Sequence, residues 1–335
     1  MIKKLNSAVV GLGFGERHLK CFRKNKFTNL VDFFDFDKKK NDKFKKEFKI
    51  KSSNSFKELI NKRNLNFLVI ASYDNYHFSM VSKAIAKKIN FFVEKPLCQT
   101  FKQLDKIRNN LKKTENRKIK FSINMVLRAH PKFKKIYEIV KSGAIGKIYH
   151  IEGEYNYGRF EKLKKGWRGK IPFYSVTQGG GVHILDLIHW ITKVKFERVI
   201  STSNSLNSKK TNFKYPDTTI SLLELQNGIT AKLTSNFSIF APHHHVLNIH
   251  GSKGSIFSNR EASYMYKSNK KKTKKIIIKY QNNKNYKEEI LKKFIYYILK
   301  KEKDLNTRES IFHVMQTALT IDKSLKSKKW ERVKF

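Results

Sequence analysis

Ala8-Val9-Val10-Gly11-Leu12-Gly13-Phe14-Gly15-Glu16-Arg17-His18 is an apolar, β-prone run that breaks into a glycine-rich turn and continues as a helix-like segment. Strand, glycine turn and helix is the order that a dinucleotide-binding site requires. Gly11 allows the tight turn, and Gly13 lets the backbone approach a pyrophosphate that faces the helix amides. We predict that Gly11, Gly13, Phe14 and Gly15 line a cofactor, with an ordinary loop as the alternative. The third glycine of the usual G-x-G-x-x-G pattern would fall at position 16, so this turn is one residue short.

The next predicted strand supports the cofactor interpretation. Leu30-Val31-Asp32-Phe33-Phe34-Asp35 is β-prone, and its last residue lies about 20 residues beyond the glycines. A carboxylate there can accept hydrogen bonds from both ribose hydroxyls and would repel a 2′-phosphate, so Asp35 favours NAD over NADP. The lysines at positions 38–40 follow closely and leave NADP open. Asp37 competes for the same role, and either carboxylate could instead begin a turn.

Strands and helices alternate through the rest of the N-terminal half. A capping-box pattern at Ser55-Phe56-Lys57-Glu58 predicts a helix start, 67–71 is a buried strand, and 91–93 is a further strand. Right-handed crossovers between such strands predict a doubly wound parallel sheet, an α/β fold with its ligand site at the carboxyl ends of the strands. Gly11, Asp35, Ser72 and Glu94 all fall at these ends.

The periodicity changes from about Ile148 onward. Long β-prone runs at 219–225, 229–237, 246–250 and 276–280 are separated by Asn-Gly and Gly-x-x-Gly turns, which predicts a large, mostly antiparallel open sheet. We therefore expect an NAD(P)-binding Rossmann domain over residues 1–122 and a C-terminal α+β domain over residues 123–335. A helix over 309–325 is expected to pack back on the protein.

The composition is strongly basic, with 72 Lys and Arg against 27 Asp and Glu and a formal net charge of +45. Lysine is spread over nearly every segment beside abundant Asn, Ile and Phe, as an AT-rich coding sequence would produce. A nucleic-acid partner therefore ranks last, because no known nucleic-acid motif accompanies the charge. The positive field would still attract an anionic ligand such as a phosphorylated sugar.

Several classes of protein are disfavoured by the sequence. Cys21 and Cys98 lack CxxC spacing and are expected to be plain thiols. No segment approaches about 18 uninterrupted apolar residues, and no signal peptide is evident, so we expect a cytoplasmic protein with no membrane partner. Consecutive residues of a strand point to alternate faces, so His243-His244-His245 cannot all bind one ion, and no metal is expected. The lysine run at 270–275 is expected to be a basic hairpin.

Several motifs together resemble the Gfo/Idh/MocA family of NAD(P)-dependent oxidoreductases, named for glucose-fructose oxidoreductase and inositol dehydrogenase. The resemblance covers almost the whole chain. It rests on the glycine turn ending in His18, Ala71-Ser72-Tyr73-Asp74-Asn75-Tyr76-His77, Glu94-Lys95-Pro96, Ser142-Gly143-Ala144-Ile145-Gly146-Lys147-Ile148, Pro216-Asp217-Thr218-Thr219, Asn227-Gly228 and Gly251-Ser252-Lys253-Gly254-Ser255.

The resemblance implies hydride transfer between a nicotinamide and a hydroxyl or keto carbon of a sugar, nucleotide sugar or cyclitol, as in carbohydrate metabolism. It places Lys95 beside both the nicotinamide and the reacting carbinol, so Lys95 belongs to the cofactor site and is also a catalytic residue, since an ammonium there favours a developing alkoxide. By the same resemblance, Glu94 helps to place the nicotinamide riboside, and Ser72, Asn75 and His77 belong to the cofactor site.

The resemblance also implies a catalytic histidine after a glycine-rich stretch, and Gln178-Gly179-Gly180-Gly181-Val182-His183-Ile184-Leu185-Asp186-Leu187-Ile188-His189-Trp190 can be aligned in two ways. Matching the His-x-x-Asp-x-x-x-Trp pattern makes His183 the acid/base and puts Gly179 where the family often has an Asp. Matching the triple glycine makes His189 catalytic instead. We favour His183, whose ordinary pKa suits proton transfer. Asp186 is then either a substrate contact or a structural carboxylate.

The segment before this stretch supplies the remaining candidates. Arg159, Trp167 and Arg168 lie where the family's substrate contacts tend to occur, and an arginine suits an anionic or polyhydroxyl ligand. The family also implies a homo-dimer or homo-tetramer formed through the C-terminal sheet. A catalytically impaired NAD(P)-binding protein with a regulatory or scaffold role is the alternative function, because the turn is shortened and the expected Asp is absent.

Overall fold

The computed structural model describes residues 4–281, 283, 285–302 and 306–334. The chain forms two compact units, Met1–Asn124 with Lys287–Phe312, and Met125–Tyr286 with His313–Phe335. The sequence placed one boundary after residue 122 and assigned everything beyond it to the second domain. The segment Lys287–Phe312 instead belongs to the first unit, which is therefore discontinuous in the chain.

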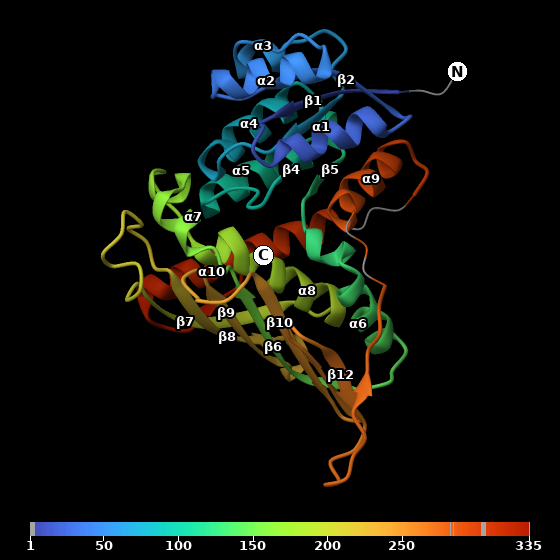
Figure 1. Ribbon diagram of the computed structural model, residues 1–335, viewed down its shortest axis with the longest axis vertical. Coiled ribbons are helices and arrows are strands. Elements are labelled where there is room, and N and C mark those ends of the chain that lie inside the picture. The colour runs from blue at the N-terminus through green and yellow to red at the C-terminus, as the bar shows by residue number, and fades with distance from the viewer. Residues whose placement is uncertain (1–3, 282, 284, 303–305, 335) are drawn as a thin grey trace. The chain divides into compact units, whose positions relative to one another are not determined.

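The first unit is built on a five-stranded parallel sheet in the order β2-β1-β3-β4-β5 (Figure 1). The strand order reverses between β1 and β3, which is where a doubly wound sheet places its ligand. The elements, in chain order, are β1 (Leu5–Val10), α1 (Gly15–Lys24), β2 (Thr28–Phe34), α2 (Lys38–Phe48), α3 (Phe56–Ile60), β3 (Phe67–Ile70), α4 (Asp74–Ala86), β4 (Asn90–Val93), α5 (Phe101–Lys112) and β5 (Phe121–Ile123).

Burial explains why these strands form a doubly wound sheet. Every residue of β3 is buried, as a strand covered by helices on both faces requires. The late helix α9 (Tyr286–Ile298) contributes to this cover, because the Phe294 ring lies 5.8 Å from the Phe67 ring and 5.9 Å from the Phe92 ring. The predicted Rossmann-type sheet is confirmed.

The second unit contains a nine-stranded sheet in the order β13-β12-β11-β10-β6-β9-β8-β7-β14. Among the described strand pairs of this sheet, only the central pair of β6 and β9 is parallel. The predicted large, mostly antiparallel sheet is therefore confirmed. The elements are α6 (Pro131–Lys141), β6 (Ile148–Asn156), α7 (Phe160–Lys165), α8 (Val182–Thr192), β7 (Phe196–Asn204), β8 (Thr218–Leu225), β9 (Thr230–Asn236), β10 (His244–Gly251), β11 (Gly254–Ser258), β12 (Ser263–Tyr266), β13 (Ile276–Ile277), α10 (Arg308–Ser327) and β14 (Glu331–Arg332).

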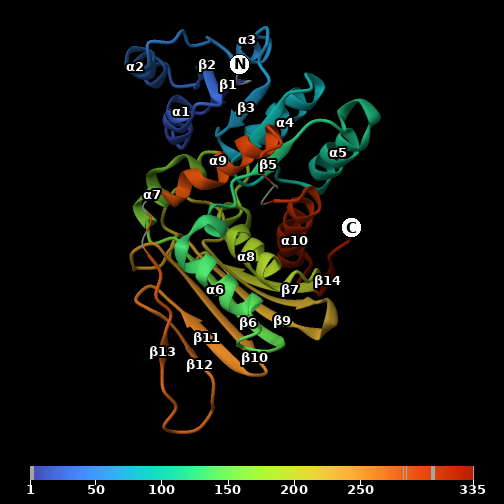
Figure 2. The same cartoon turned by 90° about the vertical axis from the view of Figure 1, so that its right-hand side faces the viewer.

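Helices α6, α8 and α10 lie on one side of this sheet (Figure 2). Helix α8 approaches β6 closely at Gly153, where a Cβ atom would overlap the Ile184 side chain. No helix among the described residues covers the other sheet face, and Ile220 and Leu222 of β8 are 41% and 50% exposed on it. Among the described residues, no helix is long and apolar enough to cross a membrane.

Candidate functional site

The three glycines between β1 and α1 each meet a different steric demand. Gly11 has φ of +86°, and a Cβ there would overlap the Ala71 carbonyl group and lie 2.5 Å from the Ser72 nitrogen. A Cβ on Gly15 would lie 2.9 Å from Val9 Cγ1, so Gly15 allows close packing of helix on strand. Gly13 has open space around its Cβ position. The short turn thus meets the three steric requirements of a dinucleotide-binding turn, and its backbone is open at Gly13.

Asp35 links the end of β2 to this turn. Its Oδ2 accepts a hydrogen bond from the Leu12 backbone N–H at 2.5 Å, and its Oδ1 accepts one from the Asp37 N–H at 2.8 Å. Asp37 itself caps α2 by accepting from the Lys39 N–H at 3.0 Å. A carboxylate has about four acceptor positions, so two remain on Asp35 for ribose hydroxyls. Asp37 therefore has a helix-capping role, which supports Asp35 as the ribose ligand.

Glu94 follows β4 and lies in a buried hydrogen-bonded cluster. Its Oε1 is 2.9 Å from His18 Nε2 and accepts a hydrogen bond from Asn124 Nδ2 at 2.7 Å. Burial alone would raise the pKa of Glu94, but the hydrogen bonds and charge of these neighbours outweigh it and hold the pKa below its usual value. Glu94 is therefore a fixed carboxylate near neutral pH. Sequence reasoning did not include Asn124, although it follows β5 at the same sheet edge.

Lys95 follows Glu94 in the chain, and His77 of α4 contacts the backbone just beyond Lys95. The two ring nitrogens of His77 face backbone carbonyl oxygens, with Nδ1 2.6 Å from Pro96 O and Nε2 3.0 Å from Ser72 O. His77 thereby joins the segments that follow β3 and β4. Lys95 is half-buried and precedes a cis peptide bond to Pro96. The backbone on either side of Lys95 is thus held by buried side chains.

Two further features of the first unit fit a bound dinucleotide. Asn75, in the first turn of α4, has a buried Oδ1 that meets no hydrogen-bond partner among the described residues. Phe36 follows Asp35, is 58% exposed, and stacks on Tyr76 with ring centroids 4.8 Å apart. Exposed stacked rings next to the ribose candidate are available to a planar base. The sequence signal for Phe36 is an aromatic residue between two aspartates just after the strand.

In the second unit, His183 lies near the start of α8, directly after a π-helical turn over Thr177–Gly181. Such turns are frequent at functional sites. The ring of His183 is buried and stacks on Tyr155 of β6, with centroids 6.0 Å apart. A Cβ on Gly180 would overlap the Tyr155 ring, and one on Gly179 would overlap the Tyr174 hydroxyl. The triple glycine therefore lets this turn lie directly on aromatic side chains.

Of the candidate substrate residues, Arg159 and Arg168 lie over the ring of Tyr157, just after β6, and Trp167 contacts Arg168. The Arg168 guanidinium carbon lies 5.0 Å from the Tyr157 ring centroid and 4.9 Å from that of Trp167. Arg168 Nε also donates to the Tyr174 hydroxyl at 2.9 Å. Arg159 is exposed, and its guanidinium carbon lies 5.5 Å from the Tyr157 ring centroid. Planar cations held over aromatic faces are suited to anionic or polyhydroxyl ligands.

Asp186 and His189 have structural partners. Both Asp186 oxygens accept hydrogen bonds from Arg128, from Nε at 2.7 Å and from Nη2 at 2.6 Å, and both side chains are buried. His189 Nδ1 lies 3.0 Å from Val194 O, its ring is 4.7 Å from that of His313, and burial lowers its pKa. These contacts support a structural role for Asp186. They also favour His183 over His189 as the acid/base.

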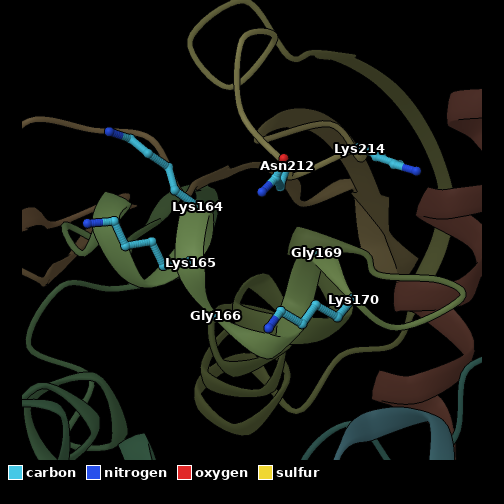
Figure 3. Close-up of a pocket in the computed structure, with 7 residues that line it drawn as sticks. All are labelled: Lys164, Lys165, Gly166, Gly169, Lys170, Asn212 and Lys214. Atoms are coloured by element: carbon cyan, nitrogen blue, oxygen red, sulfur yellow. The ribbon is translucent and has the colours of Figure 1, made fainter.

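A cavity of about 530 Å³ also lies in the second unit. It is lined by Lys164, Lys165, Gly166, Gly169, Lys170, Asn212 and Lys214 (Figure 3). Lys164 and Lys165 are ion-paired with Glu161 at 2.6 and 3.6 Å. Their side chains extend to one side of the cavity, and that of Lys214 extends to the other. Ammonium groups that point apart do not form one anion site, so we assign no function to this cavity.

Comparison with known families gives two matches. Residues 5–121 match the oxidoreductase family model with an NAD-binding Rossmann fold, designated GFO_IDH_MocA. Residues 133–257 match the C-terminal domain model of the same family. The two matches together cover most of the chain, and each lies within one of the two compact units.

Known proteins that resemble the chain are distant relatives. An uncharacterized oxidoreductase of Synechocystis is 21% identical over 268 residues, or 75% of this chain and 71% of the relative. The 2,7-anhydro-N-acetylneuraminate hydratase of Escherichia coli is 22% identical over 262 residues, or 75% and 67%. Myo-inositol 2-dehydrogenase of Lactobacillus plantarum superposes with a TM-score of 0.83 at 19% identity, over 99% and 100% of the two chains. Levoglucosan dehydrogenase with NADH and L-sorbose gives 0.86 at 15%, over 99% of each.

Proposed function

Since the chain belongs to the Gfo/Idh/MocA family of NAD-binding oxidoreductases, we propose that it transfers hydride between a nicotinamide and a hydroxyl-bearing or keto carbon of a sugar, nucleotide sugar or cyclitol. The observation that carries the proposal is the position of Gly13, Asp35 and Glu94 after β1, β2 and β4, at the carboxyl-terminal edge of one parallel sheet, with Lys95 next in the chain. Similar proteins named for inositol, levoglucosan and an anhydro-neuraminate support a sugar-like substrate.

Each unit has a distinct role in this proposal. The first unit holds the dinucleotide, with the pyrophosphate on the open face at Gly13 and the ribose at Asp35. Asn75 Oδ1 is a free acceptor for the same ligand. The second unit presents His183 and the Arg159, Trp167 and Arg168 group to the substrate. The outer sheet face around Ile220 and Leu222 is the proposed surface for a homo-dimer or homo-tetramer.

In this proposal, side chains of the protein transfer the proton and stabilise the charge of the reacting oxygen. When bound, NAD supplies the acceptor for the hydride that leaves the carbinol carbon. His183 takes the hydroxyl proton as the carbon is oxidised, since an imidazole can accept and return a proton near neutral pH. The Lys95 ammonium stabilises the developing alkoxide, and the backbone that follows Lys95 is held by His77 at Pro96 O. In the reverse direction, His183 returns the proton to the reduced carbonyl oxygen.

The test is reduction of NAD by the purified protein across a panel of sugars, sugar acids, nucleotide sugars and cyclitols. Turnover of at least one member that depends on both Lys95 and His183 would support the proposal. The alternative is an NAD-binding protein without catalysis, and the observation in its favour is Gly179, whose missing side chain leaves the Tyr174 hydroxyl where a carboxylate would be. Tight NADH binding without turnover of any panel member would favour that alternative.

Replacing Gly13 by alanine is expected to weaken NADH binding by about 10- to 100-fold, because a methyl group on the open face would separate the phosphates from the backbone amides. The melting temperature is expected to stay unchanged, since no atom lies within 4 Å of the Cβ position. Fluorescence titration and thermal unfolding measure the two effects. Gly11→Ala is the matched control, and it should lower the melting temperature because its methyl would overlap Ala71. Unchanged NADH affinity in Gly13→Ala would place the phosphates elsewhere.

Replacing Asp35 by asparagine is expected to shift the ratio of NADPH to NADH affinity upward by about 10-fold, because the charge that repels a 2′-phosphate is removed. Asparagine keeps one oxygen to accept from the Leu12 or Asp37 N–H, which limits damage to the turn. Titration with each reduced cofactor measures the ratio. Asp37→Asn is the control and should leave the ratio unchanged. A larger effect from Asp37→Asn would mean that Asp37, and not Asp35, is the ribose ligand.

A further inference from the structure

The turn that precedes His183 is a weak helical segment by its composition. Residues Thr177–Gly181 form a π-helical turn, and the last three of its five residues are glycines. Glycine is a poor helix former, because its backbone loses the most conformational freedom on folding. The turn runs directly into α8, in which His183 is the second residue. A displacement of the turn would therefore move His183 through continuous backbone.

A serine caps the start of this turn. Ser175 Oγ accepts a hydrogen bond from the Gln178 backbone N–H at 3.2 Å, and Ser175 O accepts one from the Gly179 N–H at 2.8 Å. Ser175-Val176-Thr177-Gln178 has the Ser-x-x-Gln spacing of a capping box, in which the glutamine side chain usually bonds to the backbone of the serine. Here the amide nitrogen of the Gln178 side chain donates to a residue of a different helix.

That residue is Asp322 of α10, and it bonds to the serine as well. Ser175 Oγ donates to Asp322 Oδ1 at 2.7 Å, and Gln178 Nε2 donates to Asp322 Oδ2 at 2.7 Å. The two oxygens of one carboxylate thus hold both ends of the Ser-x-x-Gln segment. Hydrogen bonds to a charged acceptor are stronger than neutral ones, and a carboxylate at the beginning of a helix is also favoured by the helix dipole.

Helix α10 is itself fixed to the sheet and to α8. Ser324 Oγ, two residues beyond Asp322, accepts a hydrogen bond from the Ser201 N–H of β7 at 3.0 Å. Farther back along the helix, the His313 ring lies 4.7 Å from the His189 ring of α8. All of these residues belong to the second unit. The carboxylate that holds the turn therefore stands on an anchored support.

The charge state of Asp322 changes within an accessible pH range. Burial raises the pKa of Asp322 to about 6, although the hydrogen bonds from Ser175 and Gln178 and the charge of Lys326 favour the carboxylate. Asp322 is therefore mostly ionised above about pH 7. When it is protonated, one of its oxygens carries a hydrogen and no longer serves as an acceptor in the same way.

We propose that Asp322 is a positioning residue, whose carboxylate holds the π-helical turn through Ser175 and Gln178 and thereby sets the place of the His183 imidazole. This inference rests on the proposed function, in which His183 is the acid/base. Asp322 acts through the turn and does not itself contact the substrate.

The first test removes both acceptor oxygens with Asp322→Leu, a replacement of similar size. We expect kcat to fall about 10- to 100-fold, because a small misplacement of a reacting group has an effect of this order. NADH affinity should stay unchanged, since the proposed cofactor contacts lie in the first unit. Glu331→Leu is the control: it removes a carboxylate that accepts from Lys323 Nζ at 2.6 Å, one residue from Asp322 on α10, and should leave kcat unchanged.

The conservative variant Asp322→Asn separates positioning from general loss of structure. Its amide oxygen can still accept from Ser175, so kcat should fall by less than about 10-fold above pH 7. An amide does not titrate in this range. As the pH is lowered from about 7 to 5, the rate of sugar oxidation should therefore fall less steeply in Asp322→Asn than in the parent protein.

A second measurement reports on His183 without any substrate. The imidazole signal of His183 is followed by proton–nitrogen correlation NMR and is assigned by its loss in His183→Gln. Asp322→Leu and Ser175→Ala should each move this signal, and Glu331→Leu should not. Thermal unfolding of every variant establishes that the comparison is made on folded protein.

The outcomes separate this inference from the proposed function. An unchanged His183 signal in folded Asp322→Leu, an unchanged kcat in an active protein, or an equal loss of kcat in Glu331→Leu would each overturn the positioning role. If Asp322→Leu did not fold, Asp322→Asn and Ser175→Ala would decide by the same comparisons. A moved His183 signal in a protein that oxidises no sugar would uphold the positioning of His183 while contradicting the dehydrogenase function.

Discussion

Lys95→Met is expected to lower kcat for hydride transfer by about 10²- to 10⁴-fold, the range that a positioned proton-transfer or charge-stabilising group contributes. Methionine keeps the length of the side chain, so the surrounding backbone, which His77 holds through Ser72 O and Pro96 O, should remain in place. NADH affinity should change little if, as proposed, the glycine turn and Asp35 provide most of the contacts with the cofactor. Single-turnover rates and NADH titration measure the two quantities.

Lys102→Met is the control for loss of a positive charge. Lys102 lies on the exposed side of α5, and its replacement should leave kcat unchanged. If Lys95→Met turned over as fast as this control, Lys95 would have no part in the chemistry. A fall in NADH affinity as large as the fall in kcat would instead make Lys95 a cofactor ligand.

Asp186→Asn is expected to reduce the free energy of unfolding by about 3–5 kcal/mol, because it leaves the Arg128 guanidinium buried without its counter-charge. The two side chains are only 4% and 3% exposed, so water cannot replace the lost carboxylate. Urea unfolding followed by fluorescence measures the change, with the transition of the second unit as the quantity of interest.

Two comparisons make this stability prediction specific. Glu138→Gln removes an exposed pair with Lys135 in the same unit and should cost less than about 1 kcal/mol. The double variant Arg128→Met with Asp186→Leu removes both charges, and it should recover most of the loss because apolar replacements of a buried pair are often neutral. A single variant as stable as Glu138→Gln would mean that Asp186 is not needed to fix α8.

The sequence predicted which residues share one edge of the first sheet, because one topological rule places them there. In a parallel sheet, residues that follow each strand meet at the same edge, so Gly11, Asp35 and Glu94 could be grouped without coordinates. The one-residue-short turn had weakened that interpretation. The close contact of Gly15 with Val9 explains how the third glycine retains its packing function despite the change.

The second unit was less predictable at its site, because its contacts join residues far apart in the chain. Nothing near Asp186 in the sequence pointed to Arg128, which lies 58 positions earlier. The histidine triplet was considered only as a metal site. The alternation along β10 that argues against a shared metal ion is also what puts His243 and His245 beside Tyr155, and that proximity depends on the pairing with β6.

Strand limits were hardest to predict at the sheet edge. The β-prone run at 276–280 predicted a strand, but β13 comprises only Ile276 and Ile277, and the Ile278 N–H adds one further hydrogen bond, to Ser263 O of β12 at 2.8 Å. An edge strand has one neighbour, and the basic stretch just before it opposes longer pairing. The sequence also does not indicate which sheet α9 covers, since Ile290, Leu291 and Phe294 on its apolar face would suit either sheet.

The return of α9 to the first sheet has a consequence for biosynthesis. Phe294 covers Phe67 and Phe92 but leaves the ribosome only after every strand of the second sheet except β14 has been translated. At about 5–20 residues per second, the nascent sheet waits on the order of ten seconds with an apolar face uncovered. During that interval the emerging chain is a natural client for a chaperone. A fragment ending at Asn124 would keep the face exposed permanently, so the cofactor-binding half cannot be cut out of the polypeptide at its first boundary.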